Sequence, residues 1–471
     1  MIELILSKDQ GQIVTDSDTL NLIREDFSIA NPAYRKNVPY MSSRLYAFTP
    51  KGKFDIGLLG EIVKVIEKYH YEYKISEDLK KLYNTGISEP LVKNLGLDYR
   101  DYQEKTIIAA LQQGRGVSVI PTAGGKTLIC AGLIASLRSN LQDEDALVLV
   151  TVPSIQLVEQ TANDFISYGL KSVCKWSGNN KLDPSAKIIV AGTQFLMSDK
   201  TDLSVLSDVK ILLVDECHNL RKGNEINKVL KFIQTSHRFG FTGTMPTSKI
   251  DQWNIIGKLG PITFEQKTLT LKKQSYISNF KITILNIIQK TKPASPQSSR
   301  PTAAYENELE FLICNKRRNE IICKLANKLT NNTLIMVDRI THGEIIEKTL
   351  KTICDVDRPL YFIRGSTEIE DRETIRSFMN ERNDVIVIAI SKIFSTGINI
   401  PNLHNIIFAS AGKAKIKIMQ SIGRALRLHP TKTMANIFDV ADNTKYGRIH
   451  LNERKKLYNL ENYEYTEKEI S

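Results

Sequence analysis

The feature that most constrains the fold is a series of short, continuous apolar runs separated by helical stretches. From about residue 100 these runs are GVSVI (116–120), ALVLVTVP (146–153), AKIIVAGT (186–193), VKILLVDE (209–216) and HRFGFTGT (237–244). Each run is rich in Val, Ile or Leu and ends in polar or glycine residues. Such strands, alternating with helices, predict βαβ units and a parallel sheet that is buried on both faces.

A second series of apolar runs repeats this architecture further along the chain. It comprises NTLIMVDR (332–339), PLYFIRGS (359–366), DVIVIAIS (384–391), HNIIFASA (404–411) and ANIFDVAD (435–442). A chain of 471 residues is too long for one hydrophobic core. The sequence therefore predicts two α/β domains in tandem, with further residues at both ends.

Changes in apolar periodicity and in residue composition along the chain set the expected domain boundaries. Residues 56–73, IGLLGEIVKVIEKYHYEY, have apolar residues at helical spacing and predict an amphipathic helix in a first, α+β domain. Residues 291–306, TKPASPQSSRPTAAYE, are rich in Pro and Ser and predict an exposed linker. We expect a small α+β domain at 1–92, an α/β domain at 93–290, the linker at 291–306, a second α/β domain at 307–445 and a charged helical tail at 446–471.

Composition excludes some classes of protein and favours one kind of partner. The chain has no run of about 18 apolar residues and no secretory leader in MIELILSKDQ, so we expect a cytoplasmic protein without a membrane span. Its net charge of +12 favours a polyanionic partner. Metal-ligand spacing is absent among the cysteines, which predicts reduced core thiols at Cys130, Cys174, Cys217, Cys314, Cys323 and Cys354.

The stretch SVIPTAGGKTLI (118–129) nearly matches the phosphate-binding pattern G-x-x-x-x-G-K-[ST], with Ile120 in place of the first glycine. A GKT triplet alone is equally typical of a glycine-rich turn. Here an apolar strand precedes the loop and a helical stretch follows it, so backbone N–H groups and Lys126 would face a phosphate, and Thr127 would bind Mg²⁺. The residues expected around the phosphates are Pro121, Thr122, Ala123, Gly124, Gly125, Lys126 and Thr127.

The run ILLVDECH (211–218) delivers two carboxylates to the end of a buried strand. Ligands of open α/β sheets bind at that edge. Asp215 suits the metal, directly or through water, and Glu216 suits a general base that polarises the attacking water. A lone Asp-Glu pair usually ends a strand in an acidic turn, but its combination with GKT favours a nucleotide site.

Eight short motifs stand in order along the chain. They are YRDYQ (99–103), PTAGGKT (121–127), VPSIQLVEQ (152–160), AGTQ (191–194), DECH (215–218), FTGT (241–244), FSTGINIP (394–401) and QSIGRALR (420–427). This order resembles the motif set of superfamily two helicases over about residues 95–440. The resemblance implies two RecA-like parallel-sheet domains, ATP and Mg²⁺ as cofactors, and a nucleic-acid partner.

The resemblance also assigns roles around the nucleotide. Gln103 would read the adenine edge, because its amide both donates and accepts hydrogen bonds. Arg424 and Arg427 lie three residues apart on an expected helix and would act as arginine fingers, stabilising the charge of phosphoryl transfer. Gln420, on the same helix stripe, would sense the nucleotide or contact His218.

Two further motifs concern the nucleotide and its coupling to nucleic acid. Gly397 marks a tight turn close to the ligand. Asn399 stands where the family often has Asp, so it can hydrogen-bond a ribose hydroxyl but brings no charge. The turn containing Thr242 and Thr244 would couple the nucleotide state to the grip on nucleic acid, together with His218.

Other motif residues are expected to contact a nucleic-acid backbone without reading its sequence. In the two α/β domains these are Pro153, Gln160, Thr193, Gln194 and, in a turn at 341–343, Thr341. The N-terminal segment interleaves basic and aromatic residues, a mixture that suits a duplex or branched backbone and equally a solvated basic face. Its expected contacts are Arg35, Lys36 and Arg44.

The leading hypothesis is an ATP-dependent DNA helicase or translocase, expected to be a monomer. Similarity to the recombination and branch-migration members of the superfamily favours branched or forked DNA, with recombination or replication proteins as partners. Alternatives are an RNA helicase, a duplex-DNA translocase subunit without unwinding activity, including a restriction-type motor, and a nucleic-acid-binding scaffold with a decayed ATPase. The scaffold predicts loss of Glu216, Arg424 or Arg427, and all three are present.

Overall fold

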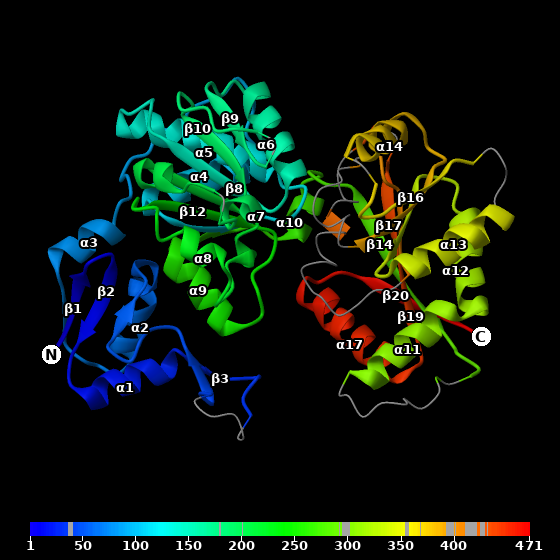
Figure 1. Cartoon of the computed structure of the whole chain (residues 1–471), viewed down its shortest axis with the longest axis horizontal. Helices are drawn as coiled ribbons and strands as arrows, with labels where there is room; N and C mark the ends of the chain where they lie inside the picture. Colours follow the sequence, from blue (N-terminus) through cyan, green and yellow to red (C-terminus); the bar gives the residue numbers. More distant parts are fainter. Residues whose placement is uncertain are drawn as a thin grey trace. The chain divides into compact units, whose positions relative to one another are not determined.

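The computed structural model describes residues 1–35, 41–178, 180–199, 201–291, 293, 302–353, 358–367, 369–391, 400, 402–409, 422–423, 429–430 and 432–471. These residues form two compact units. One is made of residues 1–120 and 125–266, and the other of residues 121–124 and 267–471. Figure 1 labels the elements of each unit.

The first unit begins with the small α+β domain that the sequence predicts. Its elements are β1 (Ile2–Ser7), β2 (Gln10–Val14), α1 (Ser17–Asp26), β3 (Ser28–Ala30), β4 (Arg44–Tyr46), β5 (Lys53–Phe54), the 3-10 turn η1 (Ile56–Leu58), α2 (Leu59–Lys68), β6 (Tyr73–Ile75) and α3 (Glu77–Tyr83). The sheet has the order β5–β2–β1–β6. The predicted amphipathic helix is α2, which buries Leu59, Ile62 and Ile66 in this core.

A seven-stranded parallel sheet forms the rest of the first unit, in the order β13–β7–β12–β11–β8–β10–β9. Its strands are β7 (Gly116–Val119), β8 (Val148–Val152), β9 (Val173–Trp176), β10 (Ile188–Gly192), β11 (Ile211–Asp215), β12 (His237–Thr242) and β13 (Ile262–Glu265). The helices are α4 (Asp101–Gln113), α5 (Lys126–Leu141), α6 (Ile155–Ser167), α7 (Thr193–Leu196), α8 (Ile226–Val229) and α9 (Lys249–Leu259).

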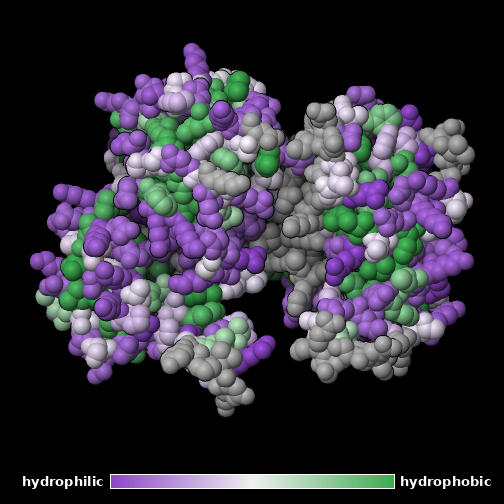
Figure 2. All heavy atoms as spheres, in the orientation of Figure 1, coloured by the Kyte–Doolittle hydropathy of each residue, from purple (hydrophilic) through white to green (hydrophobic). Residues whose placement is uncertain are grey.

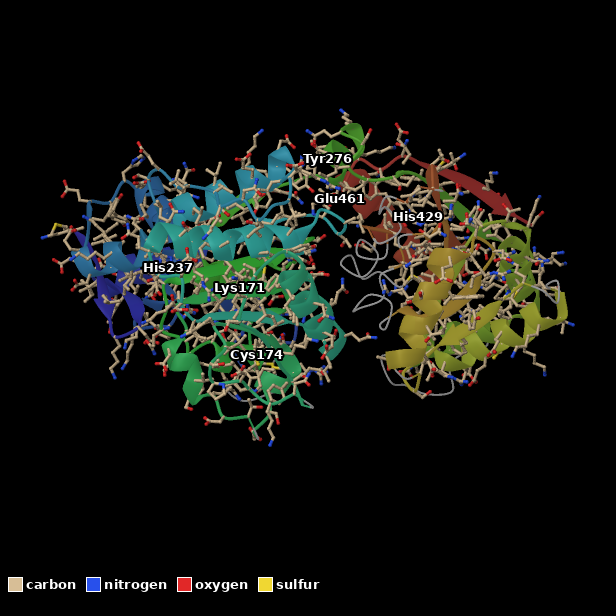
Figure 3. All side chains as sticks on the ribbon, turned by 90° about the horizontal axis from the view of Figure 1, so that it is seen from above. Lys171, Cys174, His237, Tyr276, His429 and Glu461 are labelled. Carbon is tan, nitrogen blue, oxygen red and sulfur yellow. The ribbon has the colours of Figure 1, made fainter. Side chains whose placement is uncertain are left out.

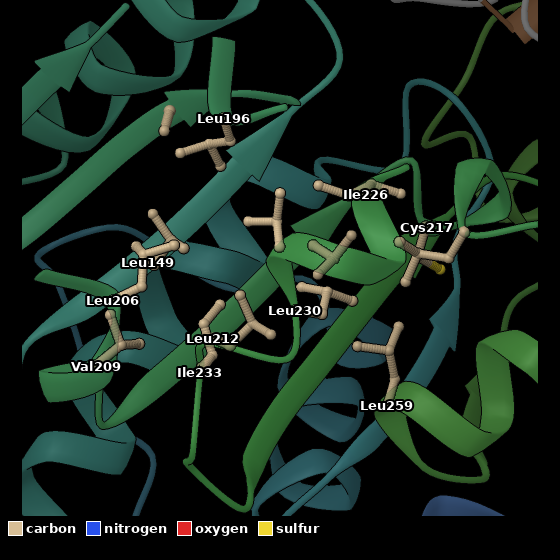
Figure 4. Packing of buried hydrophobic residues seen from close by; sticks show 14 of the residues in the cluster. Leu149, Leu196, Leu206, Val209, Leu212, Cys217, Ile226, Leu230, Ile233 and Leu259 are labelled. Atoms are coloured by element: carbon tan, nitrogen blue, oxygen red, sulfur yellow. The ribbon is translucent and has the colours of Figure 1, made fainter. Parts of the chain in front are cut away.

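Burial explains why these strands read as unbroken apolar runs. All residues of β7, β8 and β10 are buried, because helices cover both faces of a parallel sheet. On one face Leu149 and Leu212 pack with Leu206, Leu230 and Leu259 (Figure 4). The five strands predicted for this domain are all present, and β9 and β13 extend the sheet at its two edges.

The second unit also contains a seven-stranded parallel sheet, in the order β16–β17–β15–β18–β19–β14–β20. Its strands are β14 (Asn279–Ile287), β15 (Thr333–Val337), β16 (Leu360–Ile363), β17 (Ile386–Ile390), β18 (Asn405–Phe408), β19 (Met434–Asp442) and β20 (Tyr465–Ile470). The helices are α10 (Thr268–Lys273), α11 (Ala303–Cys314), α12 (Lys316–Lys328), α13 (Ile340–Ile353), α14 (Ile369–Glu381) and α17 (Lys445–Leu460). The chain thus has tandem RecA-like domains after a small α+β domain.

The structure differs from the predicted domain boundaries at three places. Strand β14 lies before residue 290 but pairs along its whole length with β19, so it belongs to the second sheet. Helix α11 begins at Ala303, inside the predicted linker. The expected helical tail contains α17 but ends in β20, which pairs with β14 and completes the sheet. The charged residues of β20 are tolerated because this strand lies at the edge of the sheet and its inner residues are exposed.

No helix in the described ranges is both long and apolar enough to cross a membrane. On the face drawn in Figure 2, hydrophilic side chains predominate over scattered hydrophobic ones. Of the predicted core thiols, Cys130, Cys174, Cys217 and Cys323 are buried, and none of these four forms a disulfide within the described residues. Cys314 is exposed near the end of α11, and Cys354 lies outside the described residues.

Candidate active site

Three of the predicted motifs meet at one edge of the first unit's parallel sheet. Strand β12 lies between β7 and β11 and pairs with both. Because the strands are parallel, the loop after β7, the carboxylates after β11 and the turn after β12 all leave the sheet at its carboxyl edge. The sheet order therefore brings together residues that are far apart in sequence.

The loop after β7 bends sharply before it enters α5. Ile120 donates its backbone N–H to the Thr242 carbonyl at 2.8 Å and is fully buried, so it ends the strand. Ala123 and Gly125 both have left-handed backbone angles, with φ of 71° and 72°. Gly125 caps α5 and is exposed, so the N-terminus of that helix opens at the loop. Exposed N–H groups at such a terminus favour an anion.

Gln103 packs against this loop from the first turn of α4. Its Oε1 accepts a hydrogen bond from the Arg100 backbone N–H at 2.9 Å, and the side chain is 3% exposed. A Cβ atom at Gly125 would lie 2.4 Å from Gln103 Nε2. Glycine is required there by this close approach as well as by its backbone angle. The amide that the sequence assigns to adenine thus lies beside the loop, with its oxygen already engaged by its own helix.

Lys126 and Glu216 face each other across this edge. Lys126 Nζ lies 3.6 Å from Glu216 Oε1, and the two side chains are only 13% and 15% exposed. Glu216 has a left-handed backbone angle, with φ of 51°, directly after the end of β11.

Asp215, at the end of β11, is crowded by a like charge. Its Oδ1 accepts the Glu216 backbone N–H at 2.9 Å. Burial and the neighbouring Glu216 carboxylate raise the pKa of Asp215 to about 6. A divalent cation would relieve this crowding, and the carboxylates with the Thr127 hydroxyl are the oxygen donors that Mg²⁺ prefers. The donor set therefore fits the magnesium nucleotide that the motifs imply.

His218 links the carboxylate to the turn after β12. Its Nδ1 lies 3.2 Å from Glu216 Oε2 and 3.0 Å from Thr242 Oγ1. Thr242 Oγ1 in turn donates to the Thr244 carbonyl at 3.0 Å. His218, Thr242 and Thr244 are all buried. The residues predicted to couple nucleotide and nucleic acid thus lie in one chain of polar contacts. His218, Thr242 and Thr244 are joined by hydrogen bonds, and His218 also lies within ion-pair distance of Glu216.

Three of the nucleic-acid residues predicted in the first RecA-like domain, Pro153, Thr193 and Gln194, follow strands at the same carboxyl edge, further along the sheet. Thr193 Oγ1 donates to the Val152 carbonyl at 3.0 Å, which joins the end of β10 to the end of β8. Pro153 follows Val152 directly and is half-buried, and Gln194 is exposed. Gln160 is half-buried on α6. Pro153 and Thr193 are thus brought together.

In the second unit one prediction needs correction and one residue was missed. Thr341 is exposed, but it lies in the first turn of α13 and not in a turn between elements, since the helix begins at Ile340. Ser391 Oγ donates to the Val337 carbonyl at 3.0 Å, joining the ends of β17 and β15 as Thr193 joins β10 and β8. A hydroxyl residue directly after a predicted strand was the signal available in the sequence.

The predicted basic residues of the N-terminal domain differ in their surroundings. Arg35 is exposed. Arg44 is exposed as well, but its Nε lies 3.0 Å from Glu25 Oε2 and donates to Ser28 Oγ at 2.9 Å. Part of the charge of Arg44 is therefore engaged in fixing β4 against the end of α1. The remaining predicted site residues lie outside the described part of the chain: Lys36, Gly397, Asn399, Gln420, Arg424 and Arg427.

Comparison with known proteins identifies the class. Residues 96–247 match the family described as "Type III restriction enzyme, res subunit", and residues 317–429 match "Helicase conserved C-terminal domain". Together with the two RecA-like sheets, these matches define a helicase motor. The chain belongs to superfamily two of the helicases and is an ATPase that moves along nucleic acid.

Individual relatives place the chain within that class. It is 27% identical over 474 residues to "ATP-dependent DNA helicase uvsW" of Enterobacteria phage T4, covering 94% of this chain and 92% of the phage protein. Two solved structures share the fold. One is the helicase MrfA bound to DNA, at a TM-score of 0.57 and 16% identity, covering 82% of this chain and 52% of MrfA. The other is Saccharomyces cerevisiae Dbp5 bound to RNA and ADP BeF3, at a TM-score of 0.54 and 15% identity, covering 86% of this chain and 95% of Dbp5.

Proposed function

We propose that this helicase acts on DNA, and that branched or forked DNA is its substrate. The observation that carries the catalytic part is the meeting of Lys126, Glu216 and His218 at one sheet edge. Similarity to the phage T4 protein named a DNA helicase, over 92% of that protein's length, supports DNA as the polymer. Action in the cytoplasm and as a monomer stays a prediction.

In this proposal Lys126 changes partner when the nucleotide binds. Its ammonium pairs with Glu216 at 3.6 Å, and a phosphate at the N-terminus of α5 would compete for the same charge. Loss of the ion pair leaves the Glu216 carboxylate available to orient and deprotonate water. Bound Mg²⁺ would supply charge stabilisation at the phosphates, with Asp215 and Thr127 as the residues that hold it. Arg424 and Arg427 keep their assignment as arginine fingers by motif alone.

Coupling would run through the shared hydrogen bonds of His218. In one arrangement Nδ1–H would donate to Glu216 Oε2, which lies 3.2 Å away, while the Thr242 hydroxyl donates to the Thr244 carbonyl. In the other arrangement the Thr242 hydroxyl donates to Nδ1, and Glu216 loses that donor. One hydroxyl proton cannot serve both acceptors. A change at Glu216 during hydrolysis therefore alters the hydrogen bonds of the turn that leads toward α9.

The nucleic acid would contact the carboxyl edge of the sheet near Pro153, Thr193 and Gln194, without reading bases. Exposed Thr341 and the Arg35 region offer further backbone contacts. We propose that the N-terminal domain provides the additional grip on a branched substrate, because its basic and aromatic residues suit a duplex backbone. Recombination or replication proteins are the expected partners.

A substrate panel tests the proposal. ATP-driven strand separation would be measured on a forked duplex, a four-way junction, a plain duplex and an RNA duplex of the same sequence. We expect the fork and the junction to be processed at least tenfold faster than the plain duplex, and the RNA duplex not at all. Equal rates on plain and branched DNA would contradict the branched-substrate proposal. Preference for the RNA duplex would replace DNA by RNA as the substrate.

A further inference from the structure

A second polar cavity lies at the opposite edge of the same sheet, where the N-terminal domain meets the first RecA-like domain. Its volume is about 450 Å³. Residues at the start of β7 and β12 line it, together with the loop before β12, the end of α9 and the segments after β1 and β5. Figure 3 labels His237 at this end of β12, toward the N-terminal domain drawn in blue. The cavity is therefore separated from Lys126 by the length of the strands.

The two domains that form the cavity are closely packed. A Cβ atom at Gly57, in η1, would lie 2.0 Å from the carbonyl oxygen of Ile256 on α9, so the two backbones touch. Trp253 of α9 packs against Phe27 of the N-terminal core with 5.4 Å between ring centroids. Such contact between backbones leaves little freedom for relative movement. The cavity walls are therefore preorganised.

The lining of the cavity has an excess of positive charge. It contains five cationic side chains against two carboxylates. One carboxylate, Asp55, is engaged by Lys258 at 2.7 Å. The guanidinium groups of Arg115 and Arg238 form no ion pair in the described part of the chain. Burial and the nearby Arg238 charge lower the pKa of Arg115 to about 10, which leaves it charged at neutral pH.

Hydrogen bonds to main-chain carbonyls fix both guanidinium groups. Arg115, which is 3% exposed, donates from Nε to the Leu259 carbonyl at 3.2 Å and from Nη1 to the Leu82 carbonyl at 3.4 Å. Arg238 donates from Nε to the Thr235 carbonyl at 2.9 Å and from Nη2 to another carbonyl of the same loop. Within the described residues, Nη2 of Arg115 and Nη1 of Arg238 have no protein acceptor.

We propose that this cavity is a second phosphate-binding site, distinct from the loop before α5. Arg115 is buried and Arg238 is half-buried, and their like charges repel each other, while neither forms an ion pair with the Asp9 or Asp55 carboxylate of the lining. A bound anion would offset this repulsion. Two planar guanidinium groups that line one cavity suit phosphate oxygens. A volume of about 450 Å³ accommodates a group of nucleotide size. The phosphate belongs either to a free phosphorylated ligand or to a nucleotide of a nucleic-acid strand.

The test uses the full chain carrying Lys126→Ala, so that the loop before α5 no longer holds phosphate strongly. Pyrophosphate is titrated by calorimetry without Mg²⁺. Lys8→Gln with Lys231→Gln removes two exposed cations from the rim of the cavity while leaving Arg115, Arg238 and their carbonyl contacts intact. Lys64→Gln, on α2 away from the cavity, is the matched control.

We expect one pyrophosphate to bind the Lys126→Ala chain, at least tenfold more weakly after the rim change and equally well after Lys64→Gln. Absence of binding, or binding that the rim change leaves unaltered, would overturn the proposal. AMP and a short DNA single strand are titrated in the same way. The ligand whose affinity falls with the rim change identifies the source of the phosphate. Because no hydrolysis or Mg²⁺ is involved, this outcome is independent of the helicase proposal.

Discussion

Replacement of Gly125 by alanine tests whether Gln103 is in close steric contact with the phosphate loop. Gly125 has φ of 72° and ψ of 39°, where a side chain costs about 1–2 kcal/mol. The new Cβ would also lie 2.4 Å from Gln103 Nε2, so the glutamine end must move and lose its bond to the Arg100 N–H. That loss adds about 1 kcal/mol. We therefore expect Gly125→Ala to lower the free energy of unfolding by about 2–3 kcal/mol, from these two contributions together.

Gly169→Ala is the matched control, because Gly169 has φ of 88° with nothing within 4 Å of its Cβ position. It should cost only the conformational part, about 1–2 kcal/mol. Urea unfolding measures both variants, and a fluorescent ATP analogue measures affinity, which should fall only in Gly125→Ala. In a double-mutant cycle, Gln103→Ala should cost about 1 kcal/mol less in the Gly125→Ala background than in the unaltered chain. Equal costs for both glycine changes, with additivity in the cycle, would refute the reasoning.

Four further outcomes follow from the geometry. Glu216→Gln should lower ATP hydrolysis at least about 100-fold while ATP binding persists, measured by phosphate release and by analogue binding. Thr242→Val should keep ATP hydrolysis within a few-fold but reduce strand separation about tenfold or more, since only the hydroxyl shared with His218 is lost. Burial lowers the pKa of His342 to about 3, so its contribution to the free energy of unfolding is fully present above pH 6.5. The free energy of unfolding should fall by on the order of 5 kcal/mol as the pH drops from 6.5 toward 3. In urea unfolding measured between pH 7 and 5, His342→Gln should make the free energy of unfolding less dependent on pH. Because the pKa of Asp215 is raised to about 6, affinity for magnesium ATP should decline as the pH falls below 6, and unchanged affinity at pH 5 would speak against Asp215 as the metal residue.

The parallel sheets were predictable because buried strands carry unbroken Val, Ile and Leu runs. All ten predicted strands are present, from β7, which buried Ile120 follows directly, to β19. The strands of these two sheets that were not predicted are β9, β13 and β20, which lie at sheet edges, and β14, which lies beside β20 and before the predicted domain boundary. Strand β20 reads YTEKEI, and an edge strand with charged residues has no apolar signal that distinguishes it from a solvated tail.

The candidate site was predictable in its residues and only partly in its contacts. Motif spacing and strand ends place Lys126, Asp215 and Glu216 at one edge, and the sheet order accounts for their meeting. The contact of Gln103 with Gly125, and the pairing of Arg44 with Glu25, depend on packing between separate elements. The cavity at Arg115 and Arg238 left no motif at all, because two isolated arginines at strand starts resemble any solvated pair.

The proposed coupling links ATP hydrolysis at Lys126 to movement along nucleic acid. It is tested most directly by phosphate release with and without forked DNA, in the unaltered chain, in Lys126→Ala and in Lys105→Ala, an exposed lysine of α4 outside the loop. We predict that forked DNA stimulates hydrolysis in the unaltered chain and in Lys105→Ala, and that Lys126→Ala shows neither basal nor stimulated hydrolysis. DNA-stimulated hydrolysis that persists in Lys126→Ala would contradict the account.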